Sequence, residues 1–343
     1  MTADIDVDVA IVGAGLSGLV CARRLNQRGV RTILLEKSRG VGGRLATRRV
    51  EGTPIDHGVR YIEAQGPYTQ QLIQQMAAMG ILSVVTSSPV LDSALDCHTE
   101  ARETPPLLYI ASPGMTAIAK ALAVDLALHR QHRVESLDCR ADRWCLGVIA
   151  AEESKTITAT AVVFAIPAPQ ILPLLPTLAD ETLSQLATAL TAVTFDPSFT
   201  VMVGYQAQSK PSRCLGLRSP TPNLSWVGFE AQKRLMSAPV LVLQSSIELA
   251  RRAIDTMSLD AIADEMVASA ETIEPVAALG APQWRQIHRW RYGFCRRPHS
   301  RPHLALRQPL PLVCCGDWCG GNTIEAAMAS GHAAAAAIAA MLP

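Results

Sequence analysis

The stretch "VAIVGAGLSG" at residues 9–18 contains three glycines in G-x-G-x-x-G spacing. Residues 6–12 alternate in polarity and then become continuously apolar, which is typical of a strand buried on both faces. After the last glycine of the motif, apolar residues recur at helical spacing until Gly29, where the helix is expected to end. The stretch "RTILLE" then predicts a second strand that ends at Glu36. These residues together predict a complete strand–helix–strand unit.

Each glycine of the motif has its own physical role. Gly13 makes the tight turn, Gly15 lets the backbone approach a pyrophosphate, and Gly18 lets helix and strand pack closely. The N–H groups at the start of the helix are oriented towards the phosphates. Glu36, eighteen residues after Gly18, is placed to accept hydrogen bonds from the adenosine ribose hydroxyls. The unit therefore predicts an ADP-containing dinucleotide, and by itself it does not distinguish NAD from FAD.

A second segment bears on that choice. The stretch "KSRGVGGRLATRR" places Gly42, Gly43 and Arg44 shortly after Glu36. This G-G-R resembles the extended FAD signature of the flavin amine oxidase superfamily. The resemblance implies that Arg44 pairs with the FAD pyrophosphate, for which a planar fork of donors is suited. The alternative is a basic surface loop, because several other arginines lie nearby.

The stretch "PLVCCGDWCGGNTIEAAMASGHAAAA" has a different pattern. It predicts a buried strand ending at Gly316 and Asp317, a glycine-rich turn, and a helix that begins near Asn322 or Thr323 with Glu325 inside its first turn. It resembles the C-terminal flavin motif of the same superfamily, in which the acid approaches the ribityl and phosphate region and the helix start faces the isoalloxazine. A helix N-terminus in that place would stabilise the negative charge of reduced flavin. Taken alone, the stretch could also be a strand–turn–helix with small residues for close packing.

The same resemblance supplies further cofactor contacts. The stretch "HRVESLDCRADRWCLGV" predicts a strand, a hairpin and a return strand, and Val134 in it occupies the position whose backbone commonly meets the adenine. Pro167 ends the apolar strand in "AVVFAIPAPQ". No "SGGC"-type attachment segment is present, so we expect non-covalent FAD, and Cys295 is more simply explained as a small buried residue. The predicted cofactor-binding residues are Gly13, Gly15, Leu16, Ser17, Gly18, Glu36, Lys37, Gly43, Arg44, Arg60, Tyr61, Val134, Pro167, Gly316, Asp317, Asn322, Thr323, Ile324 and Ala327.

The length of 343 residues exceeds one comfortable core and predicts two domains or one large interleaved body. Between about residues 171 and 281 the pattern changes to a helix near "DETLSQLATAL" and apolar strands such as "FTVMVGY", "LSWVGF" and "PVLVLQSS". These favour a mostly antiparallel sheet. We therefore predict an α/β protein. An interrupted Rossmann-like FAD-binding domain (1–75, 108–170 and 282–343) carries a second, α+β substrate domain (76–107 and 171–281).

Essentially the whole chain resembles renalase and its bacterial relatives. The resemblance rests on "DHGVRYI" at 56–62, "IASPGMTAIAKAL" at 110–122, "APQILPLL", "HRWRYG" at 288–293 and "CCGDW". Renalase relatives are FAD oxidases that take hydride from misreduced isomers of NAD(P)H, and dioxygen reoxidises the flavin to give hydrogen peroxide. This implies a dihydronicotinamide dinucleotide as substrate. An FAD-dependent amine oxidase is the alternative, and a flavin- or nucleotide-binding protein without turnover is the alternative of another class.

Lysine usage bears on the amine oxidase alternative. Many amine oxidases of the superfamily keep a lysine near flavin N5. In this chain Lys210 and Lys233 both lie in stretches that resemble loop or helix surface. That pattern argues modestly against an amine oxidase.

Four residues are candidates for the catalytic region: Tyr61, Gln244, Trp290 and Arg291. By resemblance, Tyr61 lines the flavin face, and Trp290 and Arg291 belong to the segment that closes the flavin pocket. Gln244 stands where some relatives have histidine, and it cannot act as a base at neutral pH. Hydride transfer needs alignment and exclusion of water rather than a base, so these are expected to shape the pocket.

Arg60 departs from the commoner family pattern, which often has Ala-Gln before the tyrosine where this chain has Val59 and Arg60. A guanidinium beside Tyr61 could pair with a phosphate of a dinucleotide substrate. A solvated arginine on the surface is the alternative.

Composition excludes several other classes. A net charge of +1 with 49% apolar residues gives no electrostatic footprint for nucleic acid. The first ten residues have no basic signal region, and the alanine-rich segment near the C-terminus contains Gly331 and His332, so we expect no membrane span. Nine cysteines without framework spacing fit a reducing cytoplasm. No second Cys/His pair accompanies Cys314, Cys315 and Cys319, so no metal site is expected.

Overall fold

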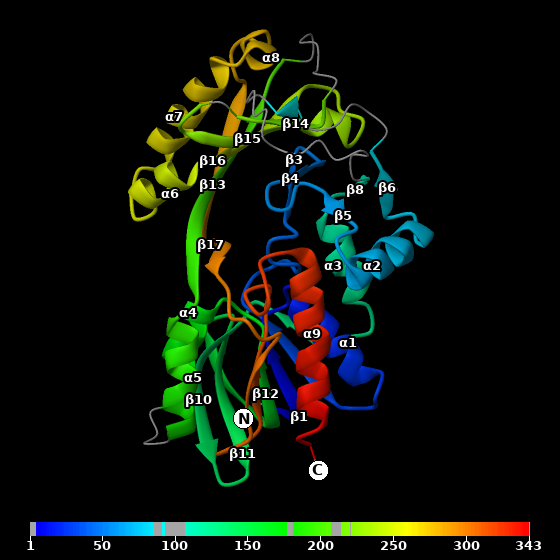
Figure 1. The fold of residues 1–343 in the computed structure, drawn as a ribbon, viewed down its shortest axis with the longest axis vertical. Helices are drawn as coiled ribbons and strands as arrows, with labels where there is room; N and C mark the ends of the chain where they lie inside the picture. Colours follow the sequence, from blue (N-terminus) through cyan, green and yellow to red (C-terminus); the bar gives the residue numbers. More distant parts are fainter. Residues whose placement is uncertain are drawn as a thin grey trace.

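The computed structural model describes residues 5–85, 91–92, 107–176, 181–206, 214–219 and 221–342. Its elements form two bodies stacked along the long axis of the molecule (Figure 1). One is a large mixed sheet covered by helices on both faces, and the other is a smaller, mostly antiparallel sheet with helices on one face. The predicted α/β class is confirmed.

The large sheet has the strand order β10-β11-β12-β1-β2-β9, with β19 beside β12 and β18 beside β19. β1 pairs in parallel with both β12 and β2, which confirms the predicted strand–helix–strand unit. β10 and β11 form the predicted hairpin. The bounds are β1 (Ile5–Val12), β2 (Thr32–Glu36), β9 (Leu128–Arg130), β10 (His132–Arg140), β11 (Arg143–Ala150), β12 (Glu153–Phe164), β18 (Leu304–Leu306) and β19 (Leu312–Cys314).

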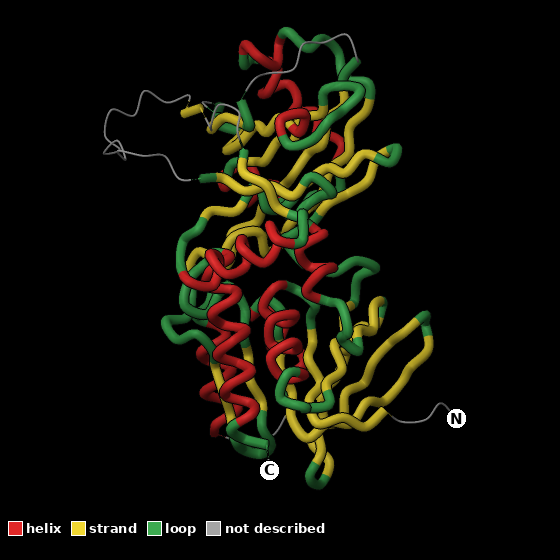
Figure 2. Tube along the Cα trace, turned by 90° about the vertical axis from the view of Figure 1, so that its right-hand side faces the viewer, coloured by secondary structure: helices red, strands yellow, loops and turns green. Residues whose placement is uncertain are grey.

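Buried apolar side chains project from both faces of this sheet, and helices cover both faces (Figure 1 and Figure 2). One face carries α1 (Leu16–Asn26), α3 (Thr116–Leu122) and α9 (Ile324–Ala339), and the other carries α4 (Ala168–Ile171), the 3-10 turn η1 (Leu172–Leu174) and α5 (Glu181–Thr191). α1 and α9 pack closely, since Gly331 lies against the backbone of Ser17 and the Ser17 hydroxyl donates to the Ala327 carbonyl at 2.8 Å.

The smaller sheet has the strand order β17-β13-β16-β15-β14-β7. Its bounds are β7 (Leu91–Asp92), β13 (Thr194–Gly204), β14 (Gly216–Arg218), β15 (Leu224–Phe229), β16 (Val240–Ser245) and β17 (Trp284–Arg297). Leucine, valine and phenylalanine side chains on one face form a core with α6 (Ile247–Ala253), α7 (Leu259–Glu271) and α8 (Glu274–Ala277). The three predicted strands of this region are therefore confirmed.

The opposite face of the smaller sheet meets a hairpin that belongs to the N-terminal part of the chain. Met202, Val240 and Val242 pack against Ile55 of that hairpin, which is made of β3 (Thr47–Val50) and β4 (Thr53–Asp56). Beyond it lies a three-stranded sheet with α2. These elements are β5 (Ile62–Glu63), α2 (Pro67–Ala78), β6 (Leu82–Val84) and β8 (Leu108–Ala111).

Two elements differ from the predicted domain boundaries. α5, grouped by sequence with the substrate domain, packs against the large sheet through Leu186 and Leu190. β17, grouped with the FAD-binding domain, pairs along most of its length with β13 in the smaller sheet. The reason is physical: an edge strand and an amphipathic helix go where a partner completes their hydrogen bonds or buries their apolar face, whatever their order in the sequence.

The contact between α1 and α9 gives a first test. A Cβ added at Gly331 would lie 2.5 Å from the Ser17 carbonyl oxygen. Gly331→Ala is expected to force the two helices apart and to lower the free energy of unfolding by about 1–3 kcal/mol, measured by urea denaturation. Gly40→Ala is the matched control, because a Cβ there meets no heavy atom within 4 Å. Equal stability of the two variants would contradict the close approach.

Candidate active site

The turn between β1 and α1 has the geometry that a pyrophosphate cradle requires. Gly13 adopts a φ of 103°, a conformation that glycine takes without steric strain. A Cβ at Gly18 would lie 2.0 Å from the Gly13 oxygen. A Cβ at Gly15, in contrast, meets nothing within 4 Å. No side chain caps the start of α1 and its first turn has no acidic residue. Leu16, Ser17 and their neighbours therefore leave backbone N–H groups for an anion.

Glu36 lies at the end of β2 beside this turn. Its carboxylate accepts hydrogen bonds from the backbone N–H of Ala14 at 2.9 Å and of Ser38 at 2.8 Å. Lys37, the next residue, is exposed. The carboxylate is therefore fixed next to the glycine turn, where the adenosine ribose was expected.

Arg44 and Asp317, predicted from two motifs 273 positions apart, meet directly. Arg44 donates to the two carboxylate oxygens of Asp317 at 2.8 and 2.6 Å, and to the Gly293 carbonyl at 3.2 Å. Gly42 forms a backbone bridge with Gly15, so the G-G-R segment also lies against the first motif. The alternative of a basic surface loop is therefore wrong for Arg44. All three predicted cofactor segments gather at one place.

The helix of the C-terminal motif begins where it was expected. Ile324 is the first residue of α9, and the Thr323 hydroxyl caps the helix by accepting from the Ala326 N–H at 3.1 Å. Asn322 donates to the Cys295 carbonyl at 3.3 Å. Glu325 was predicted inside this first turn, and its carboxylate accepts from two N–H groups at the start of α2. Glu325 therefore anchors α2.

Two predicted residues lie at the edges of this group. Pro167 follows the end of β12 and caps the short helix α4, close to the Gly13 turn that packs on Ala165 and Ile166. Val134 is buried in β10 as part of the core beneath the large sheet. With the glycine turn, Glu36 and the Arg44–Asp317 pair, the residues present fit an ADP-containing cofactor with a second, flavin-bearing half.

Two of the residues predicted to shape the substrate pocket lie on the face of the smaller sheet that meets the β4–β5 connection. Arg60 donates through Nε to Oε1 of Gln244 at 2.7 Å, and a second guanidinium nitrogen donates to the same oxygen. Gln244 in turn donates to the Gly58 carbonyl at 3.1 Å. The guanidinium carbon of Arg60 lies 4.4 Å from the centroid of the Trp226 ring. Burial lowers the pKa of Arg60 to about 10, and the nearby charge of Arg218 acts in the same direction.

This arrangement corrects one expectation and adds a residue. Arg60 is partly buried against the smaller sheet, so the alternative of a solvated surface arginine is wrong. Trp226 was not predicted as a site residue, although it supports Arg60 and lies 6.2 Å, ring to ring, from Tyr61. Its indole lies against Gly216 and Gly228, where any Cβ would collide with it. The sequence signal that could have identified Trp226 is a pair of glycines in neighbouring strands, one of them two residues after the tryptophan.

Trp290 joins the same face, and Arg291 does not. The Trp290 Nε1–H donates to the His57 carbonyl and to the Thr200 hydroxyl, both at 3.2 Å. Arg291 instead pairs with Asp255 at 2.7 Å, and half of its side chain is exposed. Because side chains alternate along a strand, residue 291 points to the opposite face from residue 290. The expectation that both close one pocket is therefore corrected for Arg291.

Two histidines beside Trp290 were missed by the sequence analysis. The ring of His57 lies 5.0 Å from that of His288 and 5.6 Å from that of Trp290. Burial, followed by the neighbouring His288 and Arg48, lowers the pKa of His57 to about 4. Burial and Arg48 lower the pKa of His288 to about 4 as well. Both rings are therefore neutral at physiological pH, and a lone histidine in a sequence carries no signal of such a pairing.

The sequence predicted Lys233 on the surface, but the structure places it in the interior. Its side chain is 5% exposed, and its ammonium pairs with Glu230 at 2.6 Å and with Asp56 at 3.6 Å. Glu230 is a neighbour in the sequence, but the second carboxylate, that of Asp56, lies on a distant strand, and the sequence does not show that the two enclose the ammonium. Lys210 lies outside the described residues.

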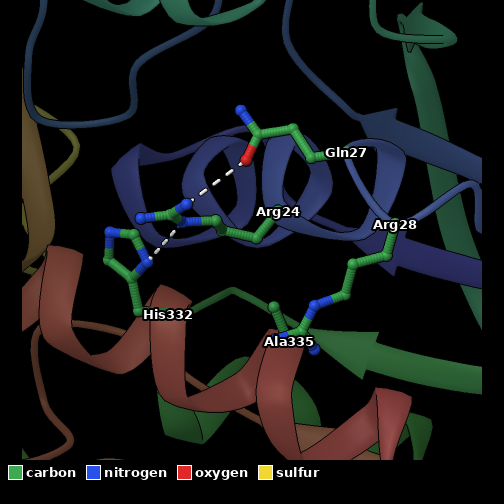
Figure 3. A pocket seen from close by; sticks show the side chains of 5 residues that line it. All are labelled: Arg24, Gln27, Arg28, His332 and Ala335. Atoms are coloured by element: carbon green, nitrogen blue, oxygen red, sulfur yellow. Dashed lines mark hydrogen bonds between the residues drawn. The ribbon is translucent and has the colours of Figure 1, made fainter.

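A separate cavity of about 410 Å³ lies on the outer side of the large sheet, between α1 and α9. Figure 3 shows Arg24 held between His332 and Gln27, with Nε donating to the His332 Nδ1 at 2.8 Å. Arg28 and Ala335 complete the lining. None of the predicted site residues lines this cavity, so it is distinct from the site described above.

Cys295 lies close to Arg44 and Asp317 and is 1% exposed. Burial, with the charge of Asp317, raises the pKa of its thiol to about 11. Among the described residues, no group of three or more His, Cys, Asp or Glu side chains could hold a metal ion. Within the same residues, no helix is both long and apolar enough to cross a membrane.

The difference between Gly15 and Gly18 can be tested. Gly15→Ala adds a methyl group where the structure is open, so the fold should keep its stability. The methyl group would stand between the backbone and the pyrophosphate, so FAD affinity should fall by about tenfold or more. Titration of the FAD-free protein followed by flavin fluorescence measures this. Retention of full FAD affinity would remove Gly15 from the cradle.

The neutral histidines predict a pH dependence of stability. An unfolded histidine binds a proton below about pH 6.5, whereas native His57 does so only near pH 4. The contribution of neutral His57 to the free energy of unfolding is therefore fully present above about pH 6.5 and is lost as the pH falls to about 4. For His57 the loss is expected to reach about 1–3 kcal/mol. His57→Asn should flatten the dependence in urea unfolding between pH 7.5 and 4.5. His132→Asn, at the start of β10, is the control, and the idea fails if both variants keep the wild-type slope.

Comparison with known protein families identifies matches over nearly the whole chain. Residues 11–76 match the model of an NAD(P)-binding Rossmann-like domain. Residues 77–339, well over half of the chain, match the model of flavin containing amine oxidoreductases.

Individual relatives match over shorter segments or with low identity. The chain is 36% identical over 76 residues to amine oxidase [flavin-containing] A of Sus scrofa, covering 22% of this chain and 14% of that protein. It is 36% identical over 70 residues to nicotine dehydrogenase of Pseudomonas putida, covering 20% and 14%. These matches span about one seventh of the length of the curated relatives.

A solved structure of putrescine oxidase bound to putrescine superposes with a TM-score of 0.70 at 14% identity, covering 98% of this chain and 100% of that chain. This likeness supports the fold that the strand order describes. With the family match and the meeting of its three cofactor segments, it leads to one conclusion: the chain belongs to the flavin containing amine oxidoreductase family.

Proposed function

We propose that this protein is a renalase-like FAD-dependent oxidase that takes hydride from a dihydropyridine, namely an isomeric or misreduced NAD(P)H. Dioxygen is the proposed oxidant of the reduced flavin, with hydrogen peroxide as product. FAD is proposed to be bound non-covalently and the protein to act in the cytoplasm, without nucleic-acid or membrane partners. The observation that carries the choice of substrate is the environment of Arg60.

Arg60 is a desolvated cation held by neutral groups. Its contacts are the amide oxygen of Gln244 and the face of Trp226, and among the described residues no carboxylate forms a salt bridge with it. Other inward cations are compensated: Arg44 pairs with Asp317, and Lys233 with Glu230. A buried charge without a counter-charge is costly, so an anionic ligand would stabilise it. A phosphate-bearing substrate supplies such an anion, whereas a protonated amine would be repelled.

The proposed chemistry also suits the polar groups present. Gln244 has no proton-accepting group at neutral pH, and a dihydropyridine donates hydride without prior removal of a proton. The ammonium of Lys233 forms ion pairs with the carboxylates of Glu230 and Asp56. Bound FAD supplies the two-electron acceptor. Trp290, Trp226 and Tyr61 then provide apolar surface that aligns the nicotinamide ring and excludes water.

In the same proposal, the cofactor segments hold FAD by known physical means. The open turn at Gly15 and the start of α1 receive the pyrophosphate, and Glu36 receives the adenosine ribose. Asp317 and the N-terminus of α9 lie on the side proposed for the flavin ring, where the helix end favours negative charge.

Anaerobic mixing of the FAD-loaded protein with candidate reductants tests the proposal. The panel contains α-NADH, isomeric dihydropyridines, ordinary β-NADH and a set of amines, and the flavin absorbance is followed. We expect the isomeric dihydropyridines to bleach the flavin and the amines to leave it oxidised. Bleaching by an amine without bleaching by any dihydropyridine would establish the amine oxidase instead. A flavin that no reductant bleaches would favour a binding protein without turnover.

Replacement of Arg60 tests the anionic contact. Arg60→Gln is expected to lower kcat/KM for isomeric NAD(P)H about tenfold, equivalent to about 1.4 kcal/mol, with FAD content unchanged. The loss should shrink for a nicotinamide mononucleoside without phosphates. Arg285→Gln is the control, since Arg285 lies exposed on β17 and pairs with Asp264. Equal kcat/KM for Arg60→Gln and wild type would remove Arg60 from substrate binding.

A further inference from the structure

Four charged side chains form a buried cluster between the smaller sheet and the β3–β4 hairpin. They are Asp56 of β4, Glu230 of the 3-10 turn η2 (Glu230–Gln232), and Lys233 and Arg234, which follow η2. The side chains are 0%, 1%, 5% and 5% exposed. Arg234 contacts Asp56 at 2.5 Å and Glu230 at 2.8 Å, and Lys233 contacts the same two carboxylates. The four formal charges cancel.

Arg234 is the member of the cluster that connects three elements of the fold. Besides the two carboxylates, it donates to the carbonyls of Pro54 and Ala111, and so holds β4, β8 and η2 at once. Asp56 is fixed from its other side by the Thr47 hydroxyl at 2.7 Å and the Met115 N–H at 2.8 Å. Burial alone would raise the pKa of Asp56, but Lys233 and Arg234 bring it below its ordinary value.

Such a cluster gives little net stability, because apolar residues of similar volume often stabilise a core as well or better. It does impose one geometry, since displacement of any member leaves a buried charge without its partner. The residues that follow Asp56 are the ones that touch the smaller sheet: the His57 carbonyl accepts from Trp290, the Gly58 carbonyl accepts from Gln244, and Arg60 donates to Gln244.

We propose that Arg234 is a positioning residue for the substrate site: it fixes Asp56, and thereby places Arg60 on Gln244 and Trp226 to receive an anion. This inference rests on the proposed function, in which Arg60 meets a phosphate of the substrate. Arg234 itself contacts neither the cofactor segments nor Gln244. We therefore expect its effect on anion binding to pass through Asp56 and the residues that follow it, up to Arg60.

The experiment is a double-mutant cycle on FAD-loaded protein, with inorganic pyrophosphate as the probe and calorimetry as the measurement. Arg234→Lys keeps the charge but loses the fork that serves four acceptors. We expect it to weaken pyrophosphate binding about tenfold while FAD content stays unchanged. Arg252→Lys is the matched control, because Arg252 makes an exposed pair with Glu265 and should bind pyrophosphate as wild type does.

The cycle separates positioning from a general structural effect. If Arg234 acts through Arg60, Arg234→Lys added to Arg60→Gln should change pyrophosphate binding less than twofold further. Additive losses, or wild-type binding by Arg234→Lys, would overturn the inference while the proposed function stands. If the wild type binds no pyrophosphate, the anionic subsite of the proposed function fails, and this inference fails with it. Should Arg234→Lys not yield folded protein, Glu230→Gln takes its place in the cycle.

Discussion

The buried carboxylate of Asp56 connects the two bodies of the molecule, because it accepts from groups on both. Arg234 and Lys233 approach it from the smaller sheet, and Thr47 and Met115 from the elements around the large one. A carboxylate so enclosed tolerates little displacement, since each lost partner exposes an uncompensated charge. Asp56 therefore helps to fix the smaller sheet relative to the cofactor segments, together with the contacts that Arg44 and Asn322 make with carbonyls of β17.

The positively charged side chains have different partners on the two sides of the site. On the cofactor side, Arg44 and Asp317 compensate each other and the glycine turn offers backbone dipoles. On the side proposed for the substrate, Arg60 contacts an amide and an indole, neither of which carries a charge. The first arrangement suits a cofactor held by many weak contacts, and the second leaves an attraction that an anionic substrate can complete. This contrast, more than the fold, distinguishes candidate substrates within the family.

Most of the cofactor segments could be predicted because their signals are local. Gly13 and Gly18 are required by the turn in which they lie, and the start of α9 follows from its capping residue. The substrate side was predicted less well. Trp290 and Gln244 both contact the segment that follows Asp56, whereas Arg291 points to the opposite face of β17. Arg291 had been grouped with Trp290 by sequence proximity, but neighbouring side chains of a strand point to opposite faces.

The sequence by itself determined the strand–turn–helix units, the hairpin and the class of the fold, because hydrophobic period and glycine position act over a few residues. Only the tertiary structure decided which charges meet. Lys233 looked like a surface residue until Asp56, far away in the chain, was found to join Glu230 as its second buried carboxylate. Arg60 allowed both a solvated and a buried position until Trp226 and Gln244 enclosed it. Electrostatic partners are set by distance in space, and a linear sequence does not contain that distance.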